Sequence, residues 1–99
     1  MEGARFVDPE ICRDYLIYGK IKTIGSLKST LYGYKAGCLE DAEFGWKEVC
    51  RRAEESFLAN ATAMGADIAA HFKTVCVKND LEGFIMLRGE AYKTIEPEN

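Results

Sequence analysis

One long amphipathic pattern runs through the middle of the chain, from Glu40 to Met64. Its apolar residues recur at intervals of three, four and seven and form one stripe, which comprises Trp46, Val49, Cys50, Ala53, Phe57, Ala61 and Met64. Acidic residues crowd the first turn, where they meet the positive end of the helix dipole, and Gly65 follows where a left-handed residue would end a helix. The pattern therefore predicts a helix over 40–64.

Two antiparallel strands are predicted after this helix. Apolar and β-branched residues fill the stretch from Asp67 to Val77, and turn-forming residues occupy positions 79–83. A further alternating stretch runs from Phe84 to Lys93. Since a short turn joins the two stretches, we expect them to pair with each other.

The chain before the helix has weaker patterns. Asp8 followed by Pro9 is typical of a helix start, but the pattern soon changes and predicts only a short helical turn. From Tyr15 to Leu27 aromatic and β-branched residues alternate, which predicts a strand with Gly19 at a bulge or a close backbone approach. Positions 26–38 could hold a short strand or a glycine-rich connection, and we expect a loop.

These elements follow the order β-α-β-β and predict an α+β fold. We expect a three-stranded antiparallel sheet with one long helix packed on one face. The 99 residues form a single domain, with an irregular N-terminal segment over 1–14, the core over 15–94 and a frayed tail over 95–99. A domain of this size leaves much of its surface exposed unless copies associate.

Alternation in the last strand predicts which of its side chains the helix covers. Successive side chains of a strand point to opposite faces of the sheet. One set contains Ile85 and Leu87 and ends in the small residues Gly89 and Ala91, which suit a closely packed helix. We therefore expect the helix to cover this set.

The opposite face of the predicted sheet carries large apolar side chains that a single helix cannot cover. Exposed apolar surface of this kind is typical of an interface. The candidate interface residues are His71, Val75, Phe84, Met86 and Tyr92. We expect a homo-oligomer, a dimer or a ring, that forms through this face; alternatively, the segment from Phe6 to Arg13 could fold back over it.

The charge and hydropathy of the chain limit the classes of partner that it can bind. With 13 basic and 16 acidic residues the net charge is −3, so the chain lacks the basic field that phosphate backbones attract, and we expect no nucleic acid partner. No apolar run approaches the roughly 20 residues that cross a bilayer, and the first residues lack the apolar core of a signal peptide. We expect a cytoplasmic protein with no membrane partner.

The cysteines and the single histidine limit the possible chemistry. Cys12, Cys38, Cys50 and Cys76 are irregularly spaced, and in a reducing compartment we expect free thiols. A zinc or copper site needs three or four converging ligands, and strand alternation places His71 and Cys76 on opposite faces. We therefore expect no metal site within one subunit, while a site shared between subunits through His71 stays open.

Catalysis and cofactor binding find no support in the residue patterns. A nucleophile needs a base within hydrogen-bond reach, and His71 would have to serve as the single imidazole. Carboxylates such as Glu54 and Glu55 lie on the polar side of the helix, and Gly83 and Gly89 have no phosphate-loop spacing. We expect no enzyme activity and no cofactor, and residues that would bind a small-molecule ligand are unknown.

Two short motifs resemble a known family. The helix ends in Ala-Thr-Ala-Met-Gly-Ala-Asp at 61–67, and the last strand carries Arg-Gly-Glu-Ala-Tyr at 88–92. Over 40–93 these motifs and the order of elements resemble the small YbjQ-like proteins, a family assigned to heavy-metal binding. The resemblance implies a β-α-β-β core that assembles into a ring-like oligomer. The chain departs from the family before the helix, where Gly-Gly-Glu and Ala-Arg elements are missing, and at Asp67, which replaces an asparagine.

A more distant resemblance, in strand order, is to dodecin, a flavin-storing ring. The flavin-stacking tryptophan of dodecin lies on a strand, whereas Trp46 lies on the predicted helix, which disfavours flavin binding. Two hypotheses about function result. The first is a small non-enzymatic oligomeric assembly or binding domain, and the second is a ligand-storage or metal-handling protein with a site formed between subunits.

Overall fold

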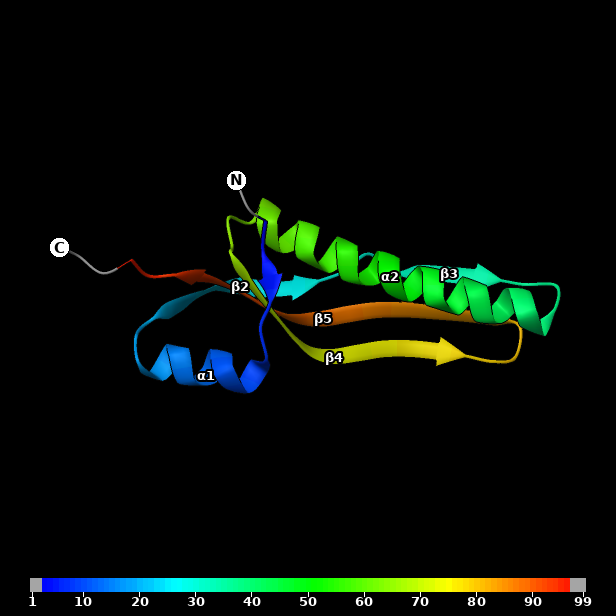
Figure 1. Cartoon of the computed structure of the whole chain (residues 1–99), viewed down its shortest axis with the longest axis horizontal. Helices are drawn as coiled ribbons and strands as arrows, with labels where there is room; N and C mark the ends of the chain where they lie inside the picture. The colour runs from blue at the N-terminus through cyan, green and yellow to red at the C-terminus, as the bar shows by residue number, and fades with distance from the viewer. Residues whose placement is uncertain (1–2, 97–99) are drawn as a thin grey trace.

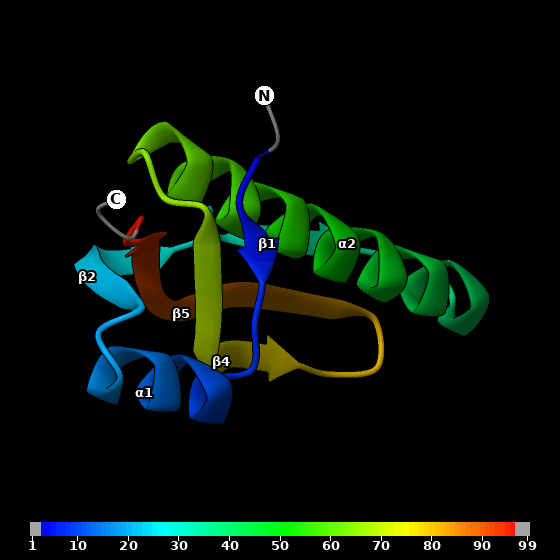
Figure 2. The ribbon, with the colours of Figure 1, turned by 60° about the vertical axis from the view of Figure 1, so that its left-hand side comes forward.

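The computed structural model describes residues 3–96, which form two helices and five strands (Figure 1). In chain order these are β1 (Arg5–Phe6), α1 (Pro9–Ile17), β2 (Ile21–Lys28), β3 (Tyr32–Lys35), α2 (Leu39–Ala63), β4 (Ile68–Lys78) and β5 (Glu82–Thr94). The two helices lie on opposite sides of the sheet (Figures 1 and 2). The fold is therefore α+β, as predicted, with one long helix packed on the sheet.

The sheet is mixed and has five strands, so the prediction of three antiparallel strands is wrong. Its order is β1-β4-β5-β2, and β3 also pairs with β5. β1 runs parallel to β4, while the other pairs are antiparallel. The 13-residue β5 pairs with β3 near its start and with β2 towards its end. The region 26–38, expected to be a loop, therefore contains a strand, and Tyr32 and Tyr34 of that strand pack against the core under α2.

Strand β1 and most of helix α1 lie within residues 3–14, so the expectation of an irregular N-terminal segment is wrong for this part of the chain. Positions 1–2 of the predicted segment lie outside the described residues. Asp8 caps α1 as predicted, because its side-chain oxygen accepts the backbone N–H two residues further on at 2.8 Å. The helix continues to Ile17, and Gly19, with a φ of 70°, lies after its end rather than at a bulge in a strand. The strand predicted for this region therefore begins only at Ile21.

The predicted tail over 95–99 is described only as far as Glu96. Ile95 donates its backbone N–H to the carbonyl oxygen of Lys20 at 2.9 Å. This bond holds the chain that follows β5 beside the chain that precedes β2. Positions 97–99 lie outside the described residues.

Helix α2 begins and ends within one residue of the predicted bounds. Gly65, with a φ of 86°, follows its C-terminal residues, as the sequence pattern indicates. Six of the seven predicted stripe residues pack on the sheet: Val49, Ala53, Phe57 and Ala61 are buried, and Trp46 and Cys50 are partly buried against the same core. Met64, the C-cap residue, is 40% exposed. From the sheet, Ile85, Leu87 and Ala91 are buried beneath the helix, which confirms the face predicted for the last strand.

Phe57 packs at the centre of this contact, over Gly89 of β5. A Cβ atom at Gly89 would overlap the backbone carbonyl of Ala70 in β4 and would lie 3.0 Å from the ring of Phe57. The ring of Phe57 is fully buried and stacks on Phe6 of β1, with 5.7 Å between the ring centroids. The helix and the two central strands therefore come together because Gly89 has no side chain.

Helix α1 builds a second core on the other face of the sheet, at one end. Its buried residues are Cys12, Ile21, Ile68, Ala70 and Tyr92, and Val7 and Leu16 pack against them. Figure 1 shows that α1 lies below the part of the sheet where β2, β4 and β5 cross, and does not extend beneath the β4–β5 hairpin. Most of the hairpin therefore has a helix on one side only.

Replacing Phe57 by Ala should lower the free energy of unfolding by about 3–5 kcal/mol, because a fully buried ring is lost and a cavity remains. Phe44 is the matched control, since it lies on the same helix and is 71% exposed. Its replacement by Ala should change the unfolding free energy by less than about 0.5 kcal/mol. Urea denaturation followed by circular dichroism measures both, and equal midpoints for the two variants would contradict the packing of α2.

Candidate functional site

A β-bulge in β4 decides which of its side chains face α2. The pairing of β4 with β5 shifts between His71 and Lys73, so that His71 and Thr74 lie on the same side of the sheet. A hydrogen bond of 2.9 Å joins Nε2 of His71 to Oγ1 of Thr74, and the His71 ring meets Phe57 edge-on at 6.1 Å. The pairing also places Cys76 on this side, opposite Ile85. The prediction that His71 and Cys76 lie on opposite faces is therefore wrong.

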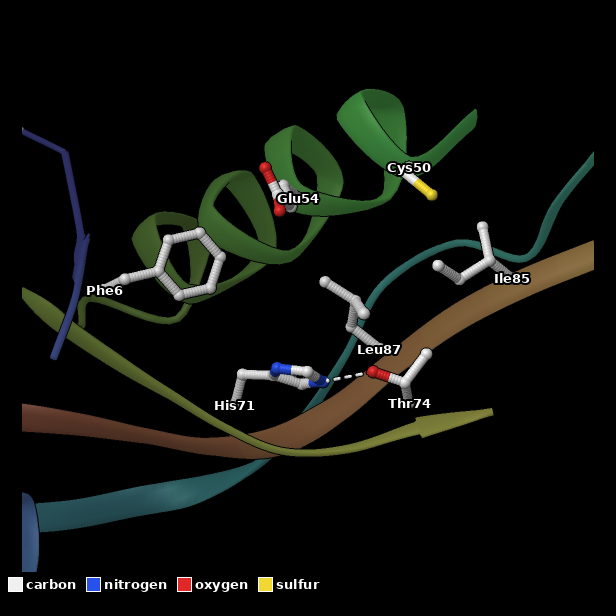
Figure 3. Close-up of a pocket in the computed structure, with 7 residues that line it drawn as sticks. All are labelled: Phe6, Cys50, Glu54, His71, Thr74, Ile85 and Leu87. Atoms are coloured by element: carbon white, nitrogen blue, oxygen red, sulfur yellow. Dashed lines mark hydrogen bonds between the residues drawn. The ribbon is translucent and has the colours of Figure 1, made fainter. Parts of the chain in front are cut away.

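His71 and Thr74 line a groove between α2 and β4 (Figure 3). The groove has a volume of about 310 Å³. Helix α2 contributes Cys50 and Glu54 to it, and β1 contributes the ring of Phe6. We name it the α2–β4 groove. It is the place where the fold brings an imidazole, a thiol and a carboxylate near one another.

The chemistry of the α2–β4 groove does not favour a metal ion or a thiolate. Burial, with a further effect of the neighbouring Glu54 carboxylate, raises the pKa of the Cys50 thiol, so the thiol stays protonated at neutral pH. A protonated thiol is a poor ligand and a poor nucleophile. Within residues 3–96 no three His, Cys, Asp or Glu side chains converge in an arrangement that could hold a metal ion. The heavy metal that the family resemblance implies therefore does not fit this groove in a single subunit.

The open face is the part of the sheet surface opposite α2 that runs from Phe72, beside α1, to the hairpin turn. Its apolar side chains are Phe72, Val75, Val77, Phe84 and Met86. Phe72 is 50% exposed, Val77 is 69% exposed and Phe84 is 47% exposed. Cross-strand pairing sets Val75 beside Met86 and Val77 beside Phe84. The apolar side chains of the two strands therefore form one continuous patch.

Three of the five candidate interface residues lie on the open face, namely Val75, Phe84 and Met86. Of the other two, His71 lies on the other side of the sheet, whereas Tyr92 points to the predicted side but is not exposed there. The bulge turns His71 into the α2–β4 groove, and Tyr92, which is 2% exposed, is buried beneath α1. The Tyr92 hydroxyl donates a hydrogen bond to Glu90 at 2.9 Å, and burial raises its pKa. The alternative, cover by the segment from Phe6 to Arg13, is thus realised only at the Tyr92 end of the sheet, and Phe6 itself lies on the α2 side.

Sequence reasoning missed two residues of the open face. Val77 has the same alternation as Val75, so the pattern contained the signal for it. Phe72 has the opposite alternation and reaches the α1 side of the sheet because the bulge adds one residue to β4. A bulge of this kind leaves no periodic signal, so Phe72 could be found only from the structure.

Comparisons with known proteins identify no relative of this chain. No family model, no curated protein and no solved structure matches it. The resemblance to the YbjQ-like proteins therefore stays a prediction. In the part of the chain that the structure describes, no helix is long and apolar enough to cross a membrane.

Alkylation of the native protein should separate the cysteines by burial. Cys38 and Cys76 are exposed and should react first, whereas Cys12 is fully buried, and its pKa is raised by burial and by Asp8. Cys12 should therefore react only after unfolding. Cys50, half-buried with a raised pKa, should react more slowly than Cys76 at neutral pH, because a raised pKa lowers its thiolate fraction.

Peptide mapping by mass spectrometry after timed exposure to iodoacetamide measures the order of labelling. The label on Cys50 should accelerate as the pH rises, and a urea-unfolded sample serves as the control in which all four thiols react. Rapid labelling of Cys12 in the folded protein would contradict the packing of α1 on the sheet.

Proposed function

We propose that this protein is a small non-enzymatic domain that assembles with copies of itself through the open face. The observation that carries the proposal is the apolar patch of Phe72, Val75, Val77, Phe84 and Met86. Large apolar side chains gathered on one exposed surface are typical of protein interfaces rather than of monomers. The open face therefore supports an interaction through apolar contact.

The shape of the molecule supports the same proposal. Its extents are 59 × 26 × 17 Å, so it is long and thin. Helix α2 has 25 residues and follows the sheet along its length, whereas α1 has nine residues and covers one end (Figure 1). A second copy on the open face would supply the missing layer, since sheets are normally covered on their apolar sides.

The non-enzymatic part of the proposal is supported by the groups in the α2–β4 groove. The Cys50 thiol has a raised pKa, which is the opposite of what a nucleophilic cysteine needs. The His71 ring hydrogen-bonds to a threonine hydroxyl, and no carboxylate contacts it among the described hydrogen bonds. This arrangement does not orient an imidazole for proton transfer as an acid–base pair does.

Light scattering on a gel-filtration column tests the assembly. The unmodified chain should elute at a multiple of 11.1 kDa, and Met86→Lys should shift it towards the monomer, because burying a lysine charge in an apolar contact is unfavourable. The helical circular dichroism signal should be retained, since Met86 points away from α2.

Phe44→Lys is the matched control for this substitution. It introduces the same charge at an apolar residue that is 71% exposed on α2, away from the open face, and it should leave the assembly intact. A monomer at all accessible concentrations of the unmodified chain would overturn the proposal.

A second candidate function is the storage of a small ligand in the α2–β4 groove, which lies on the α2 side of the sheet rather than between subunits that meet through the open face. The specific observation is the convergence of His71, Cys50 and Glu54 on one cavity. Native mass spectrometry of the purified protein should then detect a retained small molecule that His71→Ala releases. The surface control is Thr30→Ala, which lies outside the groove. A preparation with nothing bound, in the presence of an intact oligomer, would contradict this second function and leave the first.

A further inference from the structure

The open face carries a row of three positive charges at one end of its apolar patch. The strand pairing sets Lys28 of β2 opposite Arg88 of β5, and Arg88 opposite Lys73 of β4. All three side chains are exposed, and among residues 3–96 none of them forms an ion pair with a carboxylate. Like charges directly opposite one another destabilise a sheet. An opposite charge supplied from outside the subunit would relieve this repulsion.

The other end of the same patch carries carboxylates. Glu82 lies on β5 six positions before Arg88, so both side chains point to the open face, with Phe84 and Met86 between them. Asp80 lies in the adjoining turn and is exposed. The Glu82 carboxylate accepts one hydrogen bond, from the side-chain amide of Asn79 at 3.3 Å. It forms no ion pair with a described residue, although Lys35 is its cross-strand neighbour.

The order of groups along β5 is therefore carboxylate, apolar, apolar, cation. Six residues of strand span about 20 Å, and Ile85 lies at the midpoint. A surface with opposite charges at equal distances from an apolar centre is complementary to itself after a two-fold rotation. This is the symmetry of an isologous dimer interface.

We propose that the occupant of the open face is a second copy of this chain, stacked face to face with its strands reversed about a two-fold axis near Ile85. In this arrangement, which rests on the proposed assembly, Arg88 of each subunit pairs with Glu82 of the partner subunit. Phe84 and Met86 of the two copies fill the space between the pairs. Packed sheets lie about 10 Å apart, a distance that an arginine and a glutamate can bridge together.

In this alignment the neighbouring charges attract each other on the β4 side of β5 and repel each other on the β2–β3 side. Lys73 on β4 comes near the turn that contains Asp80 of the partner subunit, because the rotation about Ile85 maps this part of β4 onto the hairpin turn. Lys28 comes near Lys35 of the partner subunit, so the β2–β3 edge contributes least to the electrostatic attraction between the subunits. Arg88 and Lys73 therefore carry the electrostatic part of the contact.

A polyanion fits the open face less well than a second copy. Glu90 lies next to the cationic row on the side away from the apolar patch. It points to the same face as the row and is the cross-strand neighbour of Ala70 and Ser26. Glu82 and Asp80 bound the apolar patch on the other side. An extended chain of phosphates would meet these carboxylates, whereas the rotated copy places cations over them.

A charge swap tests the alignment. Arg88→Glu and Glu82→Arg should each weaken self-association by roughly tenfold or more, because each replaces both ion pairs of the dimer by like-charge contacts. The double variant, with Arg88→Glu and Glu82→Arg in the same chain, should restore the dissociation constant of the unmodified protein. Sedimentation velocity over a concentration series measures this constant, and circular dichroism checks that each variant is folded. Lys47→Glu, on the exposed side of α2, is the control and should have no effect.

The outcomes separate the alignment from the assembly. If Met86→Lys dissociates the oligomer but the double variant does not associate better than either single variant, the assembly stands and the proposed alignment is overturned. If the unmodified chain is a monomer throughout, both are overturned. Rescue by the double variant, together with weaker association of the unmodified chain at high salt, is the result that supports the alignment.

Discussion

The contact of Phe57 with Gly89 is the constraint on which the arrangement of the other elements depends. Gly89 lies on the central strand β5, where its Cα is approached by the backbone of Ala70 from β4 and by the Phe57 ring from α2. Any side chain at this position would push one of these elements away. Since Phe57 also stacks on Phe6, the same contact holds β1 at the edge of the sheet. One missing side chain thus fixes a helix and three strands.

The bulge in β4 lies beside this point of close approach. Residues on the two sides of the bulge exchange faces, so that His71 turns towards α2 and Phe72 turns towards the α1 side. Without the bulge, the alternation of β4 would place His71 beside Val75 on the open face. One extra residue in the strand therefore places His71 in the α2–β4 groove and Phe72 at the α1 end of the open face.

Much of the fold could be predicted from periodic patterns. Helix α2 contains six residues of the apolar stripe and is followed by a glycine, and the β4–β5 hairpin has alternation and a turn sequence. Both elements, and the side of the sheet to which Ile85 and Leu87 point, could therefore be predicted. Helix α1 was not, because the residues around Tyr15 alternate as in a strand and the short helix gains its stability from packing on Ile68 and Tyr92. Strand β3 is only four residues long and depends on pairing with β5.

The candidate site was harder to predict than the fold because it depends on side-chain direction. Strand alternation placed Val75, Phe84 and Met86 correctly, since no irregularity lies between them and the hairpin turn. It failed for His71, which lies beyond the bulge; Tyr92 points to the predicted side of the sheet, but α1 buries it there. In both cases the deciding contact joins residues far apart in the sequence, so no local pattern could contain it.

Strand β4 is exposed from Phe72 to its end, and the charges along its edge favour the open face over the edge for the proposed assembly. β1 pairs with β4 only at Ile68 and Ala69, so β4 runs on as an edge strand towards the hairpin turn. Lysines at Lys73 and Lys78 lie on this stretch, and charged side chains on an edge strand oppose the addition of another strand. Lys78 is also held over the ring of Trp46, 4.9 Å from its centroid. Because charged side chains protect the edge while the open face is apolar, the proposed association through the face would bury the surface that the fold leaves exposed without extending the sheet.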